Sequence, residues 1–184
     1  MSFLFFLKQF FKDFKHTGAI APSSRALTKN MLKDIDFTKP AHIIELGPGT
    51  GCMTEEILSK MHPESKLTCI EINPLFCKNL LKIKTNKNFT VLEASASDFE
   101  KHFKINEVDF VVSGLPLANF KKEEILGVFN AIKKVLKPNG SYIQFQYTKR
   151  LDKVIKNHFS NVFKRFSLFN LPPAFVYSCS FKEH

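Results

Sequence analysis

Three glycines, Gly47, Gly49 and Gly51, stand at alternating positions directly after the short apolar run of residues 42–46. Glycine has no Cβ, so it lets a backbone turn tightly and approach a ligand closely. The spacing G-x-G-x-G differs from the G-x-G-x-x-G of dinucleotide-binding loops, which weakens the case for a bound pyrophosphate. Glu45 immediately precedes the loop, where its carboxylate favours a positively charged amino group over a phosphate.

A second acid, Glu71, ends the next apolar run, about 20 residues after the glycine loop. A carboxylate at the end of such a strand can accept hydrogen bonds from both hydroxyls of a ribose. A plain turn and a solvated glutamate would explain each feature separately. Their combination indicates a site for an adenosine-containing ligand.

The composition is that of a folded protein with a basic surface. The chain has 184 residues, 44% of them hydrophobic and 24% charged, and this length predicts one domain over residues 1–184. The formal net charge of +10 favours polyanionic partners, either nucleic acid or an anionic membrane. The four cysteines form no C-x-x-C pair, so no metal site and no redox motif are expected, and scattered thiols fit a reducing cytoplasm.

Strands and helices alternate after residue 41. Apolar runs predict strands over residues 42–46, 67–72, 89–92, 108–113, 141–147, 163–169 and 174–181. Helical spacing predicts helices over residues 54–61, 74–83, 123–136 and 151–159, with a turn at 137–140. This alternation implies an α/β fold with a parallel sheet, and no helix separates the last two strands, so the final strand is expected to run antiparallel.

The segments 45–51 and 71–74 together resemble the class I S-adenosylmethionine-dependent methyltransferases, and the pattern covers residues 41–181. The resemblance implies a Rossmann-like fold with a seven-stranded, mostly parallel sheet, an antiparallel last strand and helices on both faces. It also implies S-adenosylmethionine as cofactor and S-adenosylhomocysteine as product. On this resemblance, Glu45 and the Gly47–Gly51 backbone hold the methionine end, Glu71 holds the ribose, and Ile72 packs on the adenine ring.

The contact to the adenine amino group stays open. The family usually carries an Asp after the third strand, where this chain reads Glu-Ala-Ser-Ala-Ser-Asp over residues 93–98. Either Ser95, beside Ala96, stands in the Asp position, or Asp98 makes the contact after a local shift. Ser113, which ends the fourth strand, is also assigned to the cofactor side of the site.

The end of the fourth strand faces the transferable methyl group in this fold, and here it reads Ser-Gly-Leu-Pro-Leu over residues 113–117. Enzymes that methylate a nucleobase amino group carry an Asn-Leu-Pro-Tyr-like motif at this point. Gly114 and Leu117 replace its amide and its stacking ring, so the turn favours a flexible aliphatic amine. Gly114, Leu115 and Pro116 are therefore predicted to lie at the reacting amine. Tyr147 is the first candidate to bond the amine or pass on its proton, and Tyr177 is the second.

Three segments, residues 18–25, 113–117 and 170–174, resemble those of bacterial phospholipid N-methyltransferases, and the likeness spans nearly the whole chain. It implies methylation of phosphatidylethanolamine, and of its methylated intermediates, towards phosphatidylcholine. The related rRNA adenine dimethyltransferases typically carry an additional C-terminal helical domain, for which this chain has no room. Ser23 and Ser24 at a helix N-terminus, with Arg25 nearby, are predicted to bind the lipid phosphate or the cofactor carboxylate.

A first helix over residues 3–15, followed by a second that runs to about residue 34, is predicted from helical spacing. An apolar face with basic flanks suits the plane of an anionic bilayer, although a helix packed over the sheet edge is the alternative. The residues predicted to contact the membrane are Phe3, Phe6, Lys8, Phe10, Lys12 and Lys15.

The sequence thus predicts a cytoplasmic enzyme that associates peripherally with the inner face of the cell membrane and has no membrane span. Nucleic acid is the less favoured partner, and an rRNA or other nucleic-acid adenine methyltransferase is the alternative function. A third hypothesis is an idle lipid- or cofactor-binding module. The oligomeric state is not predicted.

Overall fold

A computed structural model describes residues 25–83, 87–168 and 172–181 of the chain. Most of the predicted N-terminal helical region therefore lies outside the described residues. The predicted membrane and phosphate contacts that fall there are Phe3, Phe6, Lys8, Phe10, Lys12, Lys15, Ser23 and Ser24. Arg25 is the first residue of the described part, where it begins helix α2 (Arg25–Leu32).

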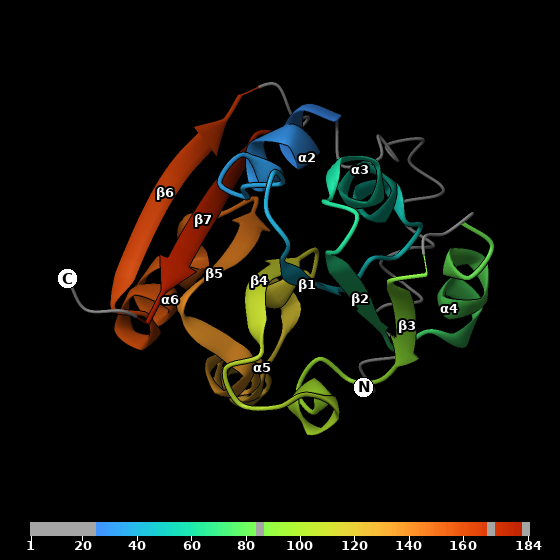
Figure 1. Ribbon diagram of the computed structural model, residues 1–184. Coiled ribbons are helices and arrows are strands. Elements are labelled where there is room, and N and C mark those ends of the chain that lie inside the picture. Colours follow the sequence, from blue (N-terminus) through green and yellow to red (C-terminus); the bar gives the residue numbers. More distant parts are fainter. Residues whose placement is uncertain (1–24, 84–86, 169–171, 182–184) are drawn as a thin grey trace.

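A seven-stranded sheet in the order β3-β2-β1-β4-β5-β7-β6 forms the centre of the fold (Figure 1). The strands are β1 (His42–Leu46), β2 (Lys66–Glu71), β3 (Phe89–Glu93), β4 (Val108–Ser113), β5 (Leu136–Gln146), β6 (Asn161–Ser167) and β7 (Ala174–Ser180). The first five strands pair in parallel, and β7 runs antiparallel to both β5 and β6. The predicted mostly parallel sheet with a reversed last strand is confirmed.

Helices cover both faces of this sheet, as predicted. They are α2, α3 (Cys52–Lys60), α4 (Pro74–Leu80), α5 (Lys122–Val135) and α6 (Asp152–His158), with short 3₁₀ turns η1 (Phe99–His102), η2 (Leu117–Asn119) and η3 (Lys149–Leu151). Ile43 packs in one apolar cluster with α2, α3 and α4, whereas its neighbour Ile44 packs in the other with α5 and α6. Successive strand residues point to opposite faces, so one buried strand serves both clusters.

The start of β5 differs from the prediction. Leu136 already pairs with Val108, and regular pairing resumes only where Ser141 meets Phe110. Residues 137–140, predicted as a turn, therefore form an irregularity inside the strand. Pro and Gly in this stretch correctly indicated that regular strand pairing is interrupted here. The sequence could not show that the strand continues on both sides of the interruption.

Arg165 of β6 ties the last edge of the sheet to α2. Its Nη1 lies 2.5 Å from Oδ2 of Asp34, its Nη2 donates to the carbonyl of Asn30 at 3.0 Å, and its Nε donates to the Asn30 side chain at 3.2 Å. The arginine side chain is only 16% exposed. One guanidinium therefore connects two segments that lie far apart in the sequence.

Replacing Arg165 with alanine is expected to lower the free energy of unfolding by about 1–3 kcal/mol, because the carbonyl of Asn30 and the carboxylate of Asp34 lose charge-assisted donors. Urea unfolding followed by circular dichroism measures the change. Lys153→Ala, which removes an exposed cation from α6, serves as the control and should leave the midpoint nearly unchanged. Equal midpoints for both variants would contradict the expectation.

Candidate active site

The glycine loop connects β1 to α3 at the carboxyl edge of the sheet. Gly47, Gly49 and Gly51 have φ angles of 66°, 56° and 89°, in the left-handed region that side chains disfavour. At Gly47 space is short as well, since a Cβ there would lie 2.7 Å from Cδ2 of Leu115. Backbone conformation and packing thus both require glycine in this loop.

Glu45 lies fully buried beneath the loop. Its Oε2 accepts hydrogen bonds from Oγ1 of Thr54 at 2.7 Å and from Sγ of Cys69 at 3.4 Å, while Oε1 has no hydrogen-bond partner among the described residues. Burial raises its pKa to about 7, against the opposing effect of the two hydrogen bonds. A buried carboxylate oxygen without a partner suits a cationic ligand group, as the predicted role requires.

Glu71 lies directly beside the glycine loop. Its Oε2 accepts from the backbone N–H of Gly49 at 3.2 Å, and its Oε1 accepts from that of Asn73 at 2.8 Å. Burial raises the pKa of Glu71, and these backbone hydrogen bonds partly oppose that effect. The fold thus brings together the acid and the loop that the sequence singled out, although ribose binding itself stays a prediction.

The remaining predicted cofactor residues follow the ends of β2 and β3. Ile72 is half-buried, and so are Ser95 and Ala96. Asp98 is exposed and pairs with Lys101 at 3.1 Å. Ser95 is engaged as well, since its hydroxyl lies 2.9 Å from that of Ser97 and accepts from the Ser97 N–H at 3.3 Å, so the adenine amino contact stays a prediction for either residue.

The acceptor turn, residues 113–117, packs against the glycine loop. The N–H of Gly114 donates to the carbonyl of Leu46 at 2.9 Å, and the N–H of Leu115 donates to the Ser113 hydroxyl at 3.3 Å. A Cβ on Gly114 would lie 2.9 Å from the carbonyl oxygen of Gly47. The predicted cofactor loop and the predicted acceptor turn therefore form one closely packed unit.

Two buried polar side chains of β5 support this turn and were not predicted. Nε2 of Gln144 donates to the carbonyl of Leu115 at 3.0 Å, and the Tyr142 hydroxyl donates to Oε1 of Gln144 at 2.8 Å. Both side chains are fully buried. The available signal was a glutamine between Ile143 and Phe145, since an amide buried there needs hydrogen-bond partners.

The two tyrosines predicted near the amine differ in their surroundings. Tyr147 follows the last residue of β5 and is 38% exposed, with its ring 5.4 Å from that of Phe145. Tyr177 is buried and donates a hydrogen bond to Asp152, which also pairs with Lys164 at 2.5 Å. Burial and the adjacent Asp152 raise the pKa of Tyr177. The hydroxyl of Tyr177 is thus engaged by Asp152, and the role of Tyr147 as proton carrier stays a prediction.

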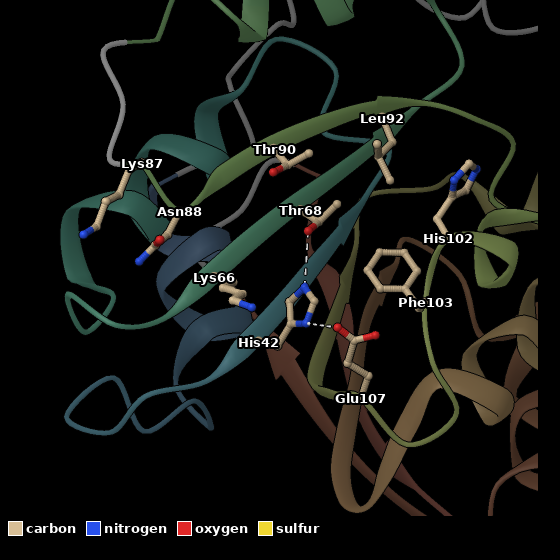
Figure 2. Close-up of a pocket in the computed structure, with 10 residues that line it drawn as sticks. All are labelled: His42, Lys66, Thr68, Lys87, Asn88, Thr90, Leu92, His102, Phe103 and Glu107. Carbon is tan, nitrogen blue, oxygen red and sulfur yellow. Dashed lines mark hydrogen bonds and ion pairs between the residues drawn. The ribbon is translucent and has the colours of Figure 1, made fainter.

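A polar pocket of about 450 Å³ opens near the amino ends of β1 and β2, away from the glycine loop (Figure 2). His42 lies at its centre, with Nε2 3.3 Å from Oγ1 of Thr68 and Nδ1 3.5 Å from Oε1 of Glu107. Burial lowers the pKa of His42, against the effect of the nearby glutamate.

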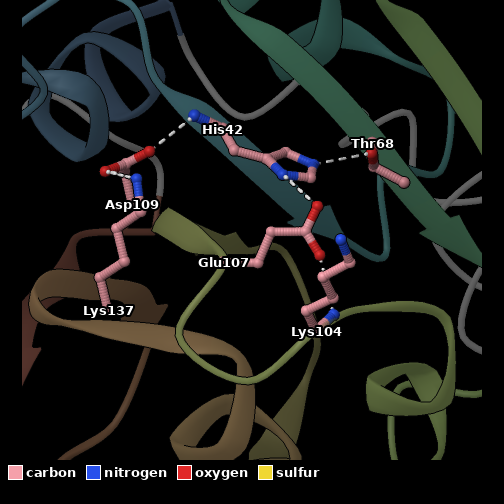
Figure 3. Close-up of polar contacts among 6 residues, drawn as sticks. All are labelled: His42, Thr68, Lys104, Glu107, Asp109 and Lys137. Atoms are coloured by element: carbon pink, nitrogen blue, oxygen red, sulfur yellow. Dashed lines mark hydrogen bonds and ion pairs between the residues drawn. The ribbon is translucent and has the colours of Figure 1, made fainter.

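The polar groups below this pocket fasten the start of β1 to that of β4 (Figure 3). The N–H of His42 donates to Oδ2 of Asp109 at 2.8 Å, and Oδ1 of Asp109 pairs with Lys137 at 2.7 Å. Glu107 also accepts from the N–H of Lys104 at 2.8 Å. These side chains bond to one another, so we interpret the cluster as stabilising the association of β1 with β4 rather than as a second candidate site.

The fold and the carboxyl-edge site define a class I S-adenosylmethionine-dependent methyltransferase, and the chain belongs to the methyltransferase domain family, whose profile matches residues 43–140. A curated relative, the ornithine lipid N-methyltransferase of Singulisphaera acidiphila, is 34% identical over 182 residues. The match covers 96% of this chain and 95% of that protein.

Solved structures share the fold at low sequence identity. The 1,6-didemethyltoxoflavin-N1-methyltransferase of Burkholderia thailandensis, with bound S-adenosylhomocysteine, has a TM-score of 0.72 and 14% identity, with 96% and 88% of the two chains covered. The precorrin-6y C5,15-methyltransferase of Geobacter metallireducens has a TM-score of 0.71 and 16% identity, with 90% and 92% covered. The predicted fold and the predicted cofactor, S-adenosylmethionine, are confirmed.

Replacing Glu71 with glutamine is expected to weaken S-adenosylhomocysteine binding by about tenfold or more, because charge-assisted hydrogen bonds to the ribose are lost. Isothermal titration calorimetry measures the affinity. Glu64→Gln removes an exposed carboxylate before the other end of the same strand and is the matched control. An affinity in E71Q equal to that of E64Q would mean that the ribose binds elsewhere.

The affinity for S-adenosylhomocysteine is expected to fall as the pH is lowered from 7 to 5. Glu45, with a pKa raised to about 7, is protonated at the lower pH, and a proton must leave before the carboxylate can pair with the ligand's ammonium group. Linkage limits this loss to about tenfold per pH unit. Glu45→Gln should bind more weakly at pH 7 and with a flatter pH profile; an unchanged slope in E45Q would refute the pairing.

Proposed function

We propose that this methyltransferase transfers methyl groups to the primary amine of a membrane lipid head group. The observation that carries the proposal is the 34% identity to an ornithine lipid N-methyltransferase over nearly the full length of both chains. The acceptor turn and the basic composition support it independently.

The acceptor turn is unsuited to a flat nucleobase. Leu117 is fully buried in the core, so its side chain offers no face on which a base could stack. An asparagine at Gly114 would bring its Cβ to 2.9 Å from the carbonyl oxygen of Gly47, so the backbone would have to shift. Both observations favour an aliphatic amine over the adenine acceptor of the alternative hypothesis.

When bound, S-adenosylmethionine supplies a sulfonium methyl group, whose C–S bond breaks as the new C–N bond forms to the amine. The chain's own task is to orient and deprotonate that amine. The backbone carbonyls at Ser113 and Gly114 are the acceptors for its N–H groups. The apolar surroundings of Leu115 disfavour the ammonium form. Tyr147 passes the released proton to solvent.

Two head groups fit this chemistry. An ornithine lipid, the acceptor in the relative's name, offers an amino-acid amine. Phosphatidylethanolamine, the acceptor predicted from the sequence, offers an amine on a phosphodiester. The identity to the relative favours the ornithine lipid as the preferred acceptor. Methylation of phosphatidylethanolamine and its methylated intermediates towards phosphatidylcholine is the second candidate.

Either acceptor requires contact with a bilayer, and we place this contact at the inner face of the cell membrane. Among residues 25–83, 87–168 and 172–181, no helix is long and apolar enough to cross a membrane. We propose a peripheral association, which the net charge of +10 supports through attraction to anionic lipids.

Label from methyl-labelled S-adenosylmethionine is expected in the lipid fraction when the full chain is offered ornithine lipid vesicles, phosphatidylethanolamine vesicles and small-subunit rRNA in parallel. Thin-layer separation identifies the labelled lipid, and Glu71→Gln serves as the impaired enzyme. Activity should fall with salt, because charge attraction to the surface is screened over about 8–10 Å at ordinary ionic strength. Label in rRNA but in neither lipid would overturn the proposal.

A further inference from the structure

We infer that a basic aromatic rim, formed by Lys149, Arg150, Phe166, Leu168 and Phe175, is the surface with which this protein contacts an anionic lipid bilayer. The inference rests on the proposed lipid acceptor and names the surface that would bring that acceptor to the site. It concerns described residues only and is separate from the predicted N-terminal helix.

The rim combines exposed apolar groups with cations. Phe166 is 50% exposed and Leu168 is 67% exposed, and the two stand an even number of residues apart near the end of β6. The Phe166 ring lies 5.0 Å from that of Phe175, and Nζ of Lys149 lies 5.3 Å from the centre of the Phe175 ring. Phe166, Phe175 and Lys149 thus contact one another in turn, and Leu168 and Arg150 adjoin them along the chain.

Strand direction places this rim at the carboxyl ends of the parallel strands, where the acceptor turn also lies. Phe166 pairs with Phe175, which in turn pairs with Gln146, the last residue of β5. β5 runs parallel to β4, which ends at Ser113 where the acceptor turn begins. In Figure 1, β6 forms the outer strand of the sheet, and its arrow ends beside the start of β7.

The chemistry of a bilayer surface matches the rim. A lipid amine stays at the membrane interface, so the sheet edge that holds the cofactor and the acceptor turn must face the bilayer. Apolar tips can enter the boundary between head groups and acyl chains while Lys149 and Arg150, both exposed, meet anionic phosphates. A net charge of +10 gives the whole protein the complementary sign.

Phe166→Ser combined with Leu168→Ser tests the rim. Phe163→Ser is the matched control, because Phe163 lies on the same strand, is 62% exposed and stands an odd number of residues from Phe166, hence on the opposite sheet face. The full chain is sedimented with vesicles of equal parts phosphatidylglycerol and phosphatidylcholine. The rim variant is expected to bind about tenfold more weakly than wild type, and F163S about as well as wild type.

Two further measurements exclude simpler explanations. S-adenosylhomocysteine affinity should be unchanged in the rim variant, which shows that the fold and the cofactor site are intact. Methyl transfer to the lipid amine should fall on vesicles but persist when the same lipid is dispersed in detergent. A second rim variant, Lys149→Glu with Arg150→Glu, should lose binding to anionic vesicles with cofactor affinity retained.

The outcomes separate this inference from the proposed function. Vesicle binding equal to wild type in the rim variant, or equal loss in F163S, would overturn the rim while leaving lipid methylation standing. Rim-dependent vesicle binding without any lipid methylation would overturn the proposed acceptor and leave the membrane surface standing. If the rim variant changes the oligomeric state in sedimentation velocity and binds vesicles as wild type does, the rim is a contact between copies of the chain.

Discussion

The glycine loop and the turn at residues 113–117 are in such close contact that neither Gly47 nor Gly114 has room for a Cβ. A Cβ on Gly47 would meet Leu115, and one on Gly114 would meet the carbonyl oxygen of Gly47. The contact follows from the pairing of Leu46 with Ser113, because two adjacent parallel strands deliver their loops to the same point. The glycine loop and the predicted acceptor turn therefore share one backbone surface, and our proposal has the acceptor recognised by backbone groups rather than by a long side chain.

The two acids of the site, Glu71 and Glu45, differ in how fully the protein satisfies their carboxylate oxygens. Glu71 has both carboxylate oxygens engaged by backbone N–H groups, so its charge is partly compensated before any ligand binds. Glu45 keeps one buried oxygen without a described partner and has its pKa raised to about 7. Such a group is costly in the free protein and is relieved by a cation. The cost is tolerated at a binding site because the ligand removes it.

Much of this arrangement could be predicted from local sequence. β1 and β4 were predicted with the observed bounds because polar or glycine residues end their apolar runs abruptly. The spacing of the loop and the acid indicated an adenosine-containing ligand, and the family resemblance that they carry implied the cofactor. The contacts of Gln144 with Leu115 and of Thr54 with Glu45 could not be predicted, since each joins two different elements through a contact that only the folded sheet creates. The β5 irregularity was missed for the same reason, because its pairing with β4 depends on register rather than on local composition.

The basic composition alone favours nucleic acid and membranes equally. The side chains that surround the lysines distinguish these two classes of partner. A nucleic acid uses cations for its phosphates and exposed aromatic rings for stacking its bases, but an exposed aliphatic side chain offers it no stacking face. Here Lys149 and Lys164 both lie over the Phe175 ring, which belongs to the basic aromatic rim. Cations held against aromatic rings, with Leu168 exposed nearby, suit an interface that is anionic at its surface and apolar just below it. The arrangement of charge, more than its amount, therefore favours a lipid surface.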